Sequence, residues 1–285
     1  MNTLLHTSFI KISNLIRNSN NLKLGSENSI ENTSGDLVKQ LDILSHNIIV
    51  DEIKSMSDIA GYISEESDDI CITSPTGKYI LAFDPLDGSS NINSNISVGT
   101  IYGVYEWDSN TREILDIQDA GYCLYGPSTS LVRTEDNEVK MYQLNSDNKF
   151  EYIADLSLKG KDTKNYSLNE SNSYRFYNHN LQKILLDYKV KKYNMRWVGS
   201  MVADCHRTLV QGGIFMYPAT TSHTLGKLRL AYESMPMAKI FESCGGESWD
   251  GCKSILDNKI DLKNIHQKIP TYLGTEMEIL KLKLN

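Results

Sequence analysis

The sequence predicts a mixed α/β protein built from two parts. Apolar residues recur at helical spacing near the N-terminus, the middle of the chain is rich in aromatic and β-branched residues, and helices alternate with strands after it. The chain has 285 residues, of which 40% are hydrophobic and 23% charged, as in globular proteins that bury a core. At about 150 residues per domain, this length favours two domains.

Two helices are predicted in the N-terminal part. The apolar face of the first is formed by Leu4, Leu5, Phe9, Ile12 and Ile16. Residues 20–34 are polar and favour a loop of a length that is often functional. The second helix is expected over residues 37–56, with Asp36 as its N-cap.

A β-rich region follows the helices. A short apolar stretch spans residues 59–63, and a strand is predicted over 79–83. Because Pro85 has no N–H to donate to a ladder, we expect this strand to end before it. Further strands are predicted at 99–107, 120–125, 130–134, 139–144 and 150–153.

The charged stretch 159–165 marks a domain boundary, so we expect domains at 1–160 and 161–285. In the second domain, helices are predicted at 180–188, 201–209 and 236–244, and a strand at 213–217. Gly245 and Gly246 provide a C-terminal stop for the last of these helices.

Charge and composition argue against several classes of function. The formal net charge is −7, so a general binder of nucleic acid is not expected. No apolar run is long enough for a membrane span, and the N-terminus lacks the features of a signal peptide. The five cysteines form no CxxC pair, which favours free thiols in a reducing, cytoplasmic compartment.

Three acidic motifs could hold a cation: Glu65-Glu66, the run 84–87, and Glu233. Carboxylate oxygens suit hard cations such as Mg²⁺ or Mn²⁺ rather than zinc. A pair of glutamates alone is usually a solvated surface feature, whereas the run directly after an apolar strand is a much stronger signal.

The run 84–87 has a physical logic. Pro85 stiffens the backbone, so the carboxylates of Asp84 and Asp87 can converge, and the carbonyl of Leu86 can add a ligand. The next residues, Gly88, Ser89 and Ser90, offer N–H groups and hydroxyls to a phosphate. Phosphate donors beside bound cations favour transfer of a phosphoryl group to water.

Lys227 and Arg229 precede Glu233 and favour a local phosphate clamp, because Arg offers a bidentate fork and Lys a point charge. A solvated edge is the alternative explanation for these two side chains.

The strings around these residues resemble class I fructose-1,6-bisphosphatases, within the metal-dependent, lithium-sensitive sugar phosphatase superfamily. The matching strings are 84–92, 97–101, 198–204, 226–230 and 236–238. The resemblance implies a layered αβαβα sandwich, shared with inositol monophosphatase-like proteins. It also implies Mg²⁺-dependent hydrolysis of the 1-phosphate of fructose 1,6-bisphosphate in gluconeogenesis.

The resemblance assigns roles to residues of this chain. Glu65, Asp84, Asp87, Glu233 and the Leu86 carbonyl would hold the cations. Asp42 and Glu66 would orient and deprotonate the attacking water, and Asp36 would lie near a third metal position. The distal phosphate would be held by Asn169, Arg196, Tyr217 and Lys227. The matching arginine crosses from a neighbouring subunit in the family, which implies a homo-oligomer, a tetramer or a dimer. His206 is expected to be structural, and Asp250 to be a turn residue.

The chain departs from the family pattern at four positions. Trp197 and Asn172 stand where tyrosines are usual, and Asn93 replaces an aspartate. Glu106 stands where AMP-inhibited members carry an arginine, although Lys78 and Tyr79 are retained. The chain also begins at or after the segment that would supply amides to the AMP phosphate. We therefore expect weak or absent inhibition by AMP.

Two other functions remain open. The changes at Trp197 and Asn172 allow sedoheptulose 1,7-bisphosphate as the substrate or as a second substrate. A catalytically weak sugar-phosphate sensor would keep the fold, but the full set of expected metal ligands argues against it.

Overall fold

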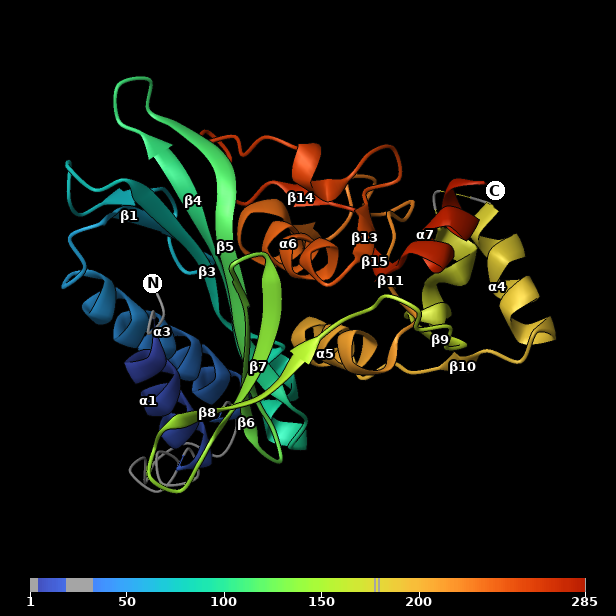
Figure 1. Cartoon of the computed structure of the whole chain (residues 1–285), viewed down its shortest axis with the longest axis horizontal. Helices are drawn as coiled ribbons and strands as arrows, with labels where there is room; N and C mark the ends of the chain where they lie inside the picture. Colours follow the sequence, from blue (N-terminus) through green and yellow to red (C-terminus); the bar gives the residue numbers. More distant parts are fainter. Residues whose placement is uncertain (1–4, 19–32, 177, 179, 285) are drawn as a thin grey trace.

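The computed structural model describes residues 5–18, 33–176, 178 and 180–284, and for residues 33–37 it describes the backbone alone. The described elements form five layers (Figure 1). Helices α1 and α3 cover one face of an eight-stranded sheet, α5 and α6 separate this sheet from a five-stranded one, and α4 and α7 cover the far face of the second sheet. The α/β class and the αβαβα sandwich are confirmed.

The first sheet has the strand order β2-β1-β3-β4-β5-β6-β7-β8. β1 and β3 are parallel and the other neighbours antiparallel. Its strands are β1 (Ile59–Ser64), β2 (Cys71–Ile72), β3 (Tyr79–Asp87), β4 (Val98–Asp108), β5 (Glu113–Tyr125), β6 (Thr129–Glu135), β7 (Glu138–Leu144) and β8 (Phe150–Leu156).

Helices α1 (His6–Arg17) and α3 (Thr33–Ile53) bury their apolar stripes against this sheet. Phe9 and Ile12 of α1 are fully buried there, which confirms the first predicted helical face. Of the second predicted face, Leu41 is fully buried, Ile48 is partly buried, and Met56 lies beyond the end of α3. A 3-10 helix, η1 (Ser89–Ser94), follows β3 directly.

The second sheet has the order β10-β9-β11-β15-β13. Its strands are β9 (Asn165–Ser167), β10 (Asn194–Met195), β11 (Ile214–Tyr217), β13 (Gly246–Trp249) and β15 (Thr271–Thr275), and β12 (Leu228–Arg229) pairs separately with β14 (Lys268–Ile269). The helices are η2 (Glu170–Arg175), α4 (Asn180–Val190), α5 (Met201–Gln211), η3 (Leu230–Ser234), α6 (Met235–Ser243), η4 (Ile255–Asp257) and α7 (Glu276–Lys283).

One core joins the two sheets. Tyr122 and Leu158 from the first half pack with Met201, Phe215 and Phe241 from the second half in a single buried cluster. The two halves of the chain are therefore packed together through a shared core, which fixes residues of one half relative to residues of the other.

Several predicted boundaries are wrong. β5 begins at Glu113 rather than at residue 120, and α3 ends at Ile53 rather than at residue 56. β3 continues through Pro85 to Asp87, because the ladder with β4 is interrupted by a bulge between Asp84 and Asp87 where no N–H from residue 85 is needed. Helix α3 begins at Thr33, so Asp36 lies within the helix and is not its N-cap; Thr33 and Ser34 are also residues that suit a helix start. The strands and the helix after residue 246 were not predicted.

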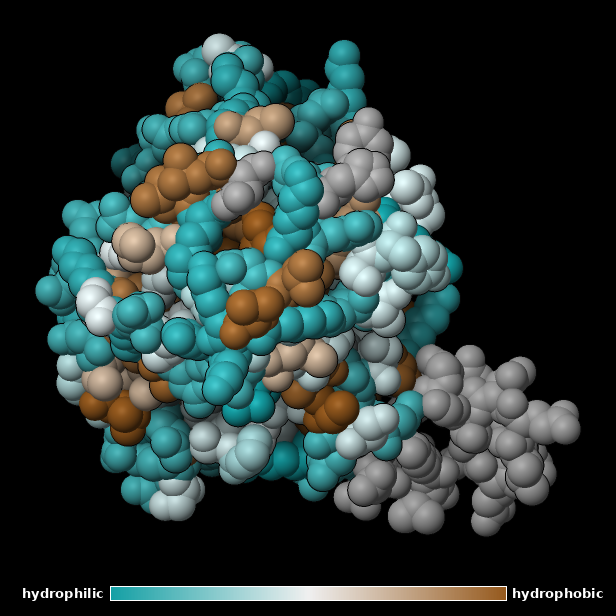
Figure 2. Space-filling view, turned by 90° about the vertical axis from the view of Figure 1, so that its right-hand side faces the viewer, coloured by the Kyte–Doolittle hydropathy of each residue, from teal (hydrophilic) through white to brown (hydrophobic). Residues whose placement is uncertain are grey.

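The right-hand side of Figure 1, where α4 and α7 lie, is mostly hydrophilic with separate hydrophobic patches (Figure 2). In the described part of the chain, no helix is long and apolar enough to cross a membrane.

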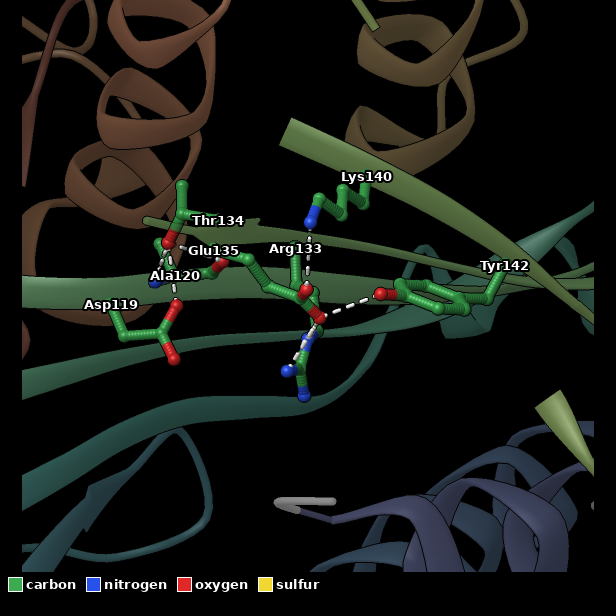
Figure 3. A network of polar contacts seen from close by, with 7 residues as sticks. All are labelled: Asp119, Ala120, Arg133, Thr134, Glu135, Lys140 and Tyr142. Carbon is green, nitrogen blue, oxygen red and sulfur yellow. Dashed lines mark hydrogen bonds and ion pairs between the residues drawn. The ribbon is translucent and has the colours of Figure 1, made fainter. Parts of the chain in front are cut away.

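A buried charge network stiffens the first sheet (Figure 3). The Arg133 side chain is only 2% exposed and its Nη2 lies 2.6 Å from Oε1 of Glu135. The Tyr142 hydroxyl donates to the same oxygen at 2.7 Å, and Lys140 lies 3.4 Å from Oε2. Glu135 therefore neutralises a cation that water cannot reach.

We expect Glu135→Gln to lower the free energy of unfolding by about 3 kcal/mol, because it removes the carboxylate charge that lies 2.6 Å from a buried guanidinium. Chemical denaturation measures this loss. The control is Asp51→Asn, which breaks the exposed Lys54–Asp51 pair and should change stability by less than about 0.5 kcal/mol. Equal effects of the two substitutions would contradict this account.

Candidate active site

The bulge at the end of β3 presents two buried carboxylates. Asp84 is 2% exposed and Asp87 is 7% exposed. The N–H of Leu86 donates to Oδ1 of Asp84 at 2.9 Å, and the N–H of Val202, in the first turn of α5, donates to Oδ2 of Asp87 at 2.7 Å. The Thr100 hydroxyl donates to the Pro85 carbonyl at 2.9 Å, so the backbone of the bulge is held from β4 as well.

A third buried carboxylate comes from the other half of the chain. Glu233 is 3% exposed and lies on η3, which is a single turn of π-helix. Carboxylate oxygens of Asp84, Asp87 and Glu233 all lie within 4.8 Å of one another. The structure thus brings together three of the predicted ligands, of which Glu233 lies far from Asp84 and Asp87 in the sequence.

The electrostatics of this trio call for a cation. Burial raises the pKa of Asp84, and repulsion from Glu65 and Asp87 raises it further. Burial likewise raises the pKa of Asp87 and of Glu233. Arg229 offsets one of three negative charges, since its Nη1 lies 3.8 Å from Oε2 of Glu233. An all-oxygen, doubly negative remainder fits a hard divalent cation.

Glu65 lies beside the trio but is not a member of it. Its backbone N–H donates to the Phe83 carbonyl at 3.2 Å, and its carboxylate lies 2.9 Å from Nη2 of Arg229. Arg229 therefore bridges Glu65 and Glu233, two predicted ligands, so its guanidinium borders the carboxylates rather than standing in solvent.

Asp42 and Glu66 form a second acidic pair. Burial, and then repulsion from Glu66, raises the pKa of Asp42 to about 7, while a hydrogen bond with Ser89 opposes the rise. Burial and repulsion from Glu65 raise the pKa of Glu66. A carboxyl group whose pKa is raised, as for Asp42 and Glu66, is suited to accept a proton.

The turn after β3 carries the predicted phosphate donors. Gly88 has φ = 76°, and a Cβ on it would lie 2.6 Å from the Ser200 hydroxyl, so both its backbone conformation and its close neighbour require glycine. Ser89 and Ser90 begin η1, where backbone N–H groups have no helical partner.

The predicted residues for the distal phosphate are only partly gathered. Asn169 and Tyr217 line one small pocket together with Trp197 and Asn172, the two departures from the family pattern. Arg196 and Lys227 are exposed and are not among the residues that line this pocket. The side chain of Asp36 lies outside the described residues.

Comparisons with known proteins decide the family. The N-terminal domain of fructose-1,6-bisphosphatase matches residues 1–154, and its C-terminal domain matches residues 160–284. The chain belongs to the fructose-1,6-bisphosphatase family. It is 39% identical to the class 1 fructose-1,6-bisphosphatase of Neisseria meningitidis over 266 residues, which cover 88% of this chain and 82% of the relative. It is also 39% identical to fructose-1,6-bisphosphatase 1 of Mus musculus, over 96% of this chain and 85% of the relative.

The fold agrees with this family. The crystal structure of Leishmania major fructose-1,6-bisphosphatase in holo form superposes with a TM-score of 0.86 and 32% identity, covering 99% of this chain and 91% of that one. The resemblance expected from the motifs is confirmed, and the protein belongs to a family of metal-dependent phosphoric monoester hydrolases.

Sequence reasoning missed how the fructose-1,6-bisphosphatase motif at 198–204 serves the site. The buried carboxylate of Asp204 accepts the N–H groups of Val198 and Gly199 at 3.0 Å each. The Gly199 carbonyl accepts from the Asn91 amide at 3.0 Å. This loop therefore ties η1 to α5. The sequence does contain a weak signal for this contact, namely an aspartate four to six residues after a glycine-containing turn.

Two smaller expectations are confirmed. His206 contacts the Tyr122 hydroxyl through Nδ1 at 2.8 Å and is not a member of the acidic trio, as expected of a structural residue. Asp250 accepts the N–H groups of Cys252 and Lys253 at 2.7 and 2.8 Å and is a turn residue.

Proposed function

We propose that this protein hydrolyses the 1-phosphate of fructose 1,6-bisphosphate, giving fructose 6-phosphate and inorganic phosphate, as a step of gluconeogenesis. The observation that carries the proposal is the buried trio Asp84, Asp87 and Glu233 beside the turn at Gly88. Family membership supplies the substrate class, a sugar bisphosphate.

Two groups of residues would have separate roles in this reaction, one in cation binding and one in proton transfer. The trio, with Glu65 and the Leu86 carbonyl, would hold Mg²⁺, with Mn²⁺ as an alternative. When bound, such cations neutralise phosphate charge and acidify a nearby water. Asp42 and Glu66 would orient this water and accept its proton, and the raised pKa of Asp42 supports a role as proton acceptor.

Phosphate binding would use both ends of the site. Backbone N–H groups of Gly88, Ser89 and Ser90 would donate hydrogen bonds to the 1-phosphate. The guanidinium of Arg229 would neutralise part of the negative charge of this phosphate. At the other end, Asn169 and Tyr217 would contact the distal phosphate, and Trp197 offers an indole N–H where the family has a phenol.

Arg196 and Lys227 would complete the distal subsite in an assembly. Because Arg196 is exposed in the single chain, it is free to reach a neighbouring subunit, which supports a homo-oligomer, a dimer or a tetramer. Asp36 would act from α3 near a third cation. The five free cysteines support a reducing compartment such as the cytoplasm. We retain residues 1–160 and 161–285 as the two functional halves.

We expect AMP to inhibit weakly or not at all. β3 and β4 place Tyr79 directly opposite Glu106, whose side chain is exposed, so a phosphate drawn to Lys78 and Tyr79 would meet a negative charge. A titration of phosphate release should show no inhibition at micromolar AMP. The comparison variant is Glu106→Gln, which removes the repulsion without adding a cation. Half-inhibition of the unchanged protein by micromolar AMP would contradict the prediction.

Substrate choice is tested by phosphate release from fructose 1,6-bisphosphate against sedoheptulose 1,7-bisphosphate, with and without Mg²⁺. The proposal expects a higher kcat/KM for the fructose ester. Trp197 and Asn172, which share the small pocket, keep the sedoheptulose ester as a second candidate, and a higher kcat/KM for that ester would establish it. Metal-independent binding without turnover would instead indicate a sensor.

A further inference from the structure

The carboxylate of Glu233 is placed by an unusual piece of backbone. Residues Leu230–Ser234 form a π-helical turn directly before α6, and the N–H of Met235 bonds to the carbonyl of Leu230, five residues earlier. π-Helical turns are rare and cost stability, so they persist where surrounding contacts hold them.

This turn deprives the Ala231 carbonyl of a helical partner. In an α-helix the partner would be the N–H of Met235, but that group is already bonded to Leu230. In a continued π-helix the partner would be residue 236, which is a proline and has no N–H. Ala231 is only 1% exposed, so bulk water does not reach the carbonyl either. A buried carbonyl without a donor is costly.

Tyr105 of β4 supplies the missing donor. Its hydroxyl donates to the Ala231 carbonyl at 2.6 Å, across 126 positions of sequence, and the side chain is fully buried. Gly103, two residues earlier on the same strand, leaves room for this contact: a Cβ there would lie 2.9 Å from the Tyr105 ring and 3.0 Å from Pro236.

We infer that Tyr105 is a positioning residue for the metal centre. Its hydroxyl holds the π-helical turn and thereby places the Glu233 carboxylate against Asp84 and Asp87. The inference rests on the proposed role of Glu233 as a metal ligand. Tyr105 is not a member of the carboxylate trio; it acts through the backbone of Ala231, two residues before Glu233.

The test is calorimetric titration of Mn²⁺ into the full-length protein without substrate, for the unchanged protein and for Tyr105→Phe. The loss of a contact that orients a metal ligand typically weakens metal binding 10–100-fold, so we expect the dissociation constant to rise about tenfold. The matched control is Tyr122→Phe, which removes an equally buried hydroxyl, bonded to His206 and not to the π-helical turn. The dissociation constant of this variant for Mn²⁺ should stay within about twofold of that of the unchanged protein, which is well below the change expected for Tyr105→Phe.

Glu233→Gln separates the two levels of the argument. If this substitution leaves Mn²⁺ binding unchanged, the proposed role of Glu233 is wrong. If it weakens binding while Tyr105→Phe does not, only the inference about Tyr105 is overturned.

Should Tyr105→Phe fail to fold, the double variant Tyr105→Phe/Pro236→Ala decides, since alanine returns an N–H at position 236. Recovery of the fold and of Mn²⁺ binding supports the inference, and failure to recover either contradicts it.

Discussion

Asp84→Asn is expected to lower kcat for fructose 1,6-bisphosphate about a thousandfold while making the metal-free protein more stable. Asp84 is the most enclosed member of the trio, and it faces Asp87 and Glu233 within 4.8 Å. Losing a ligand charge removes several kcal/mol of stabilisation from the phosphoryl-transfer transition state, and about 4 kcal/mol corresponds to a thousandfold in rate.

The free energy of unfolding of the metal-free protein should rise in Asp84→Asn, because the buried negative charge of Asp84 destabilises the folded state when no cation is bound. Burial and the carboxylates of Glu65 and Asp87 raise the pKa of Asp84, so its ionised form is disfavoured in the folded chain. Asparagine keeps the oxygen that accepts from Leu86 and removes the charge. Each kcal/mol gained should raise the melting temperature of the metal-free protein by about 2 °C for a chain of this size.

The matched control is Asp250→Asn. Asp250 is also a carboxylate of the second half of the chain, but it accepts the N–H groups of Cys252 and Lys253 within a turn. Phosphate-release assays and thermal melts of the two variants separate the roles. Near-normal activity in Asp84→Asn, or its loss in Asp250→Asn, would show that the catalytic carboxylate is misassigned.

Removing the metal should make stability fall as the pH rises from about 4 to about 8. Unfolded carboxyl groups titrate near 4. Burial raises the pKa of Asp87 to about 7 and that of Glu233 to about 8 in the folded chain. Between these limits the folded state binds more protons than the unfolded state, so the free energy of unfolding decreases with increasing pH.

Mg²⁺ should reverse this trend, because its ligands must be deprotonated and the ion binds the folded state. We expect the stabilisation by a fixed Mg²⁺ concentration to be larger at pH 8 than at pH 6.5, measured as the rise in melting temperature. The interval above 6.5 avoids His206, whose pKa burial lowers to about 4 and which therefore affects stability only at lower pH. A stabilisation by Mg²⁺ that is independent of pH would contradict the buried, proton-binding trio.

Much of the site was predictable because several of its functional groups come from residues that are neighbours in the sequence. The run 84–90 identifies a turn with two carboxylates and phosphate donors, and the structure places it at a bulge that the rule about proline in strands did not anticipate. Proline was accommodated because an irregular ladder does not need its N–H.

The remainder depends on contacts between distant segments. Nothing near Glu233 in sequence indicates that a π-helical turn carries it, or that Tyr105 on β4 of the first sheet completes that turn. The short strands after residue 246 are similarly set by their partners: β13 and β15 pair with each other, and β15 pairs with β11. Local propensity is too weak to specify such pairings.

The most direct test of the central claim is phosphorus NMR of the reaction of the purified protein with fructose 1,6-bisphosphate and Mg²⁺. The account predicts loss of the 1-phosphate resonance, appearance of fructose 6-phosphate and inorganic phosphate in equal amounts, and a turnover about a thousandfold slower with Asp84→Asn under the same conditions. Release of the 6-phosphate instead, or undiminished turnover by Asp84→Asn, would contradict it.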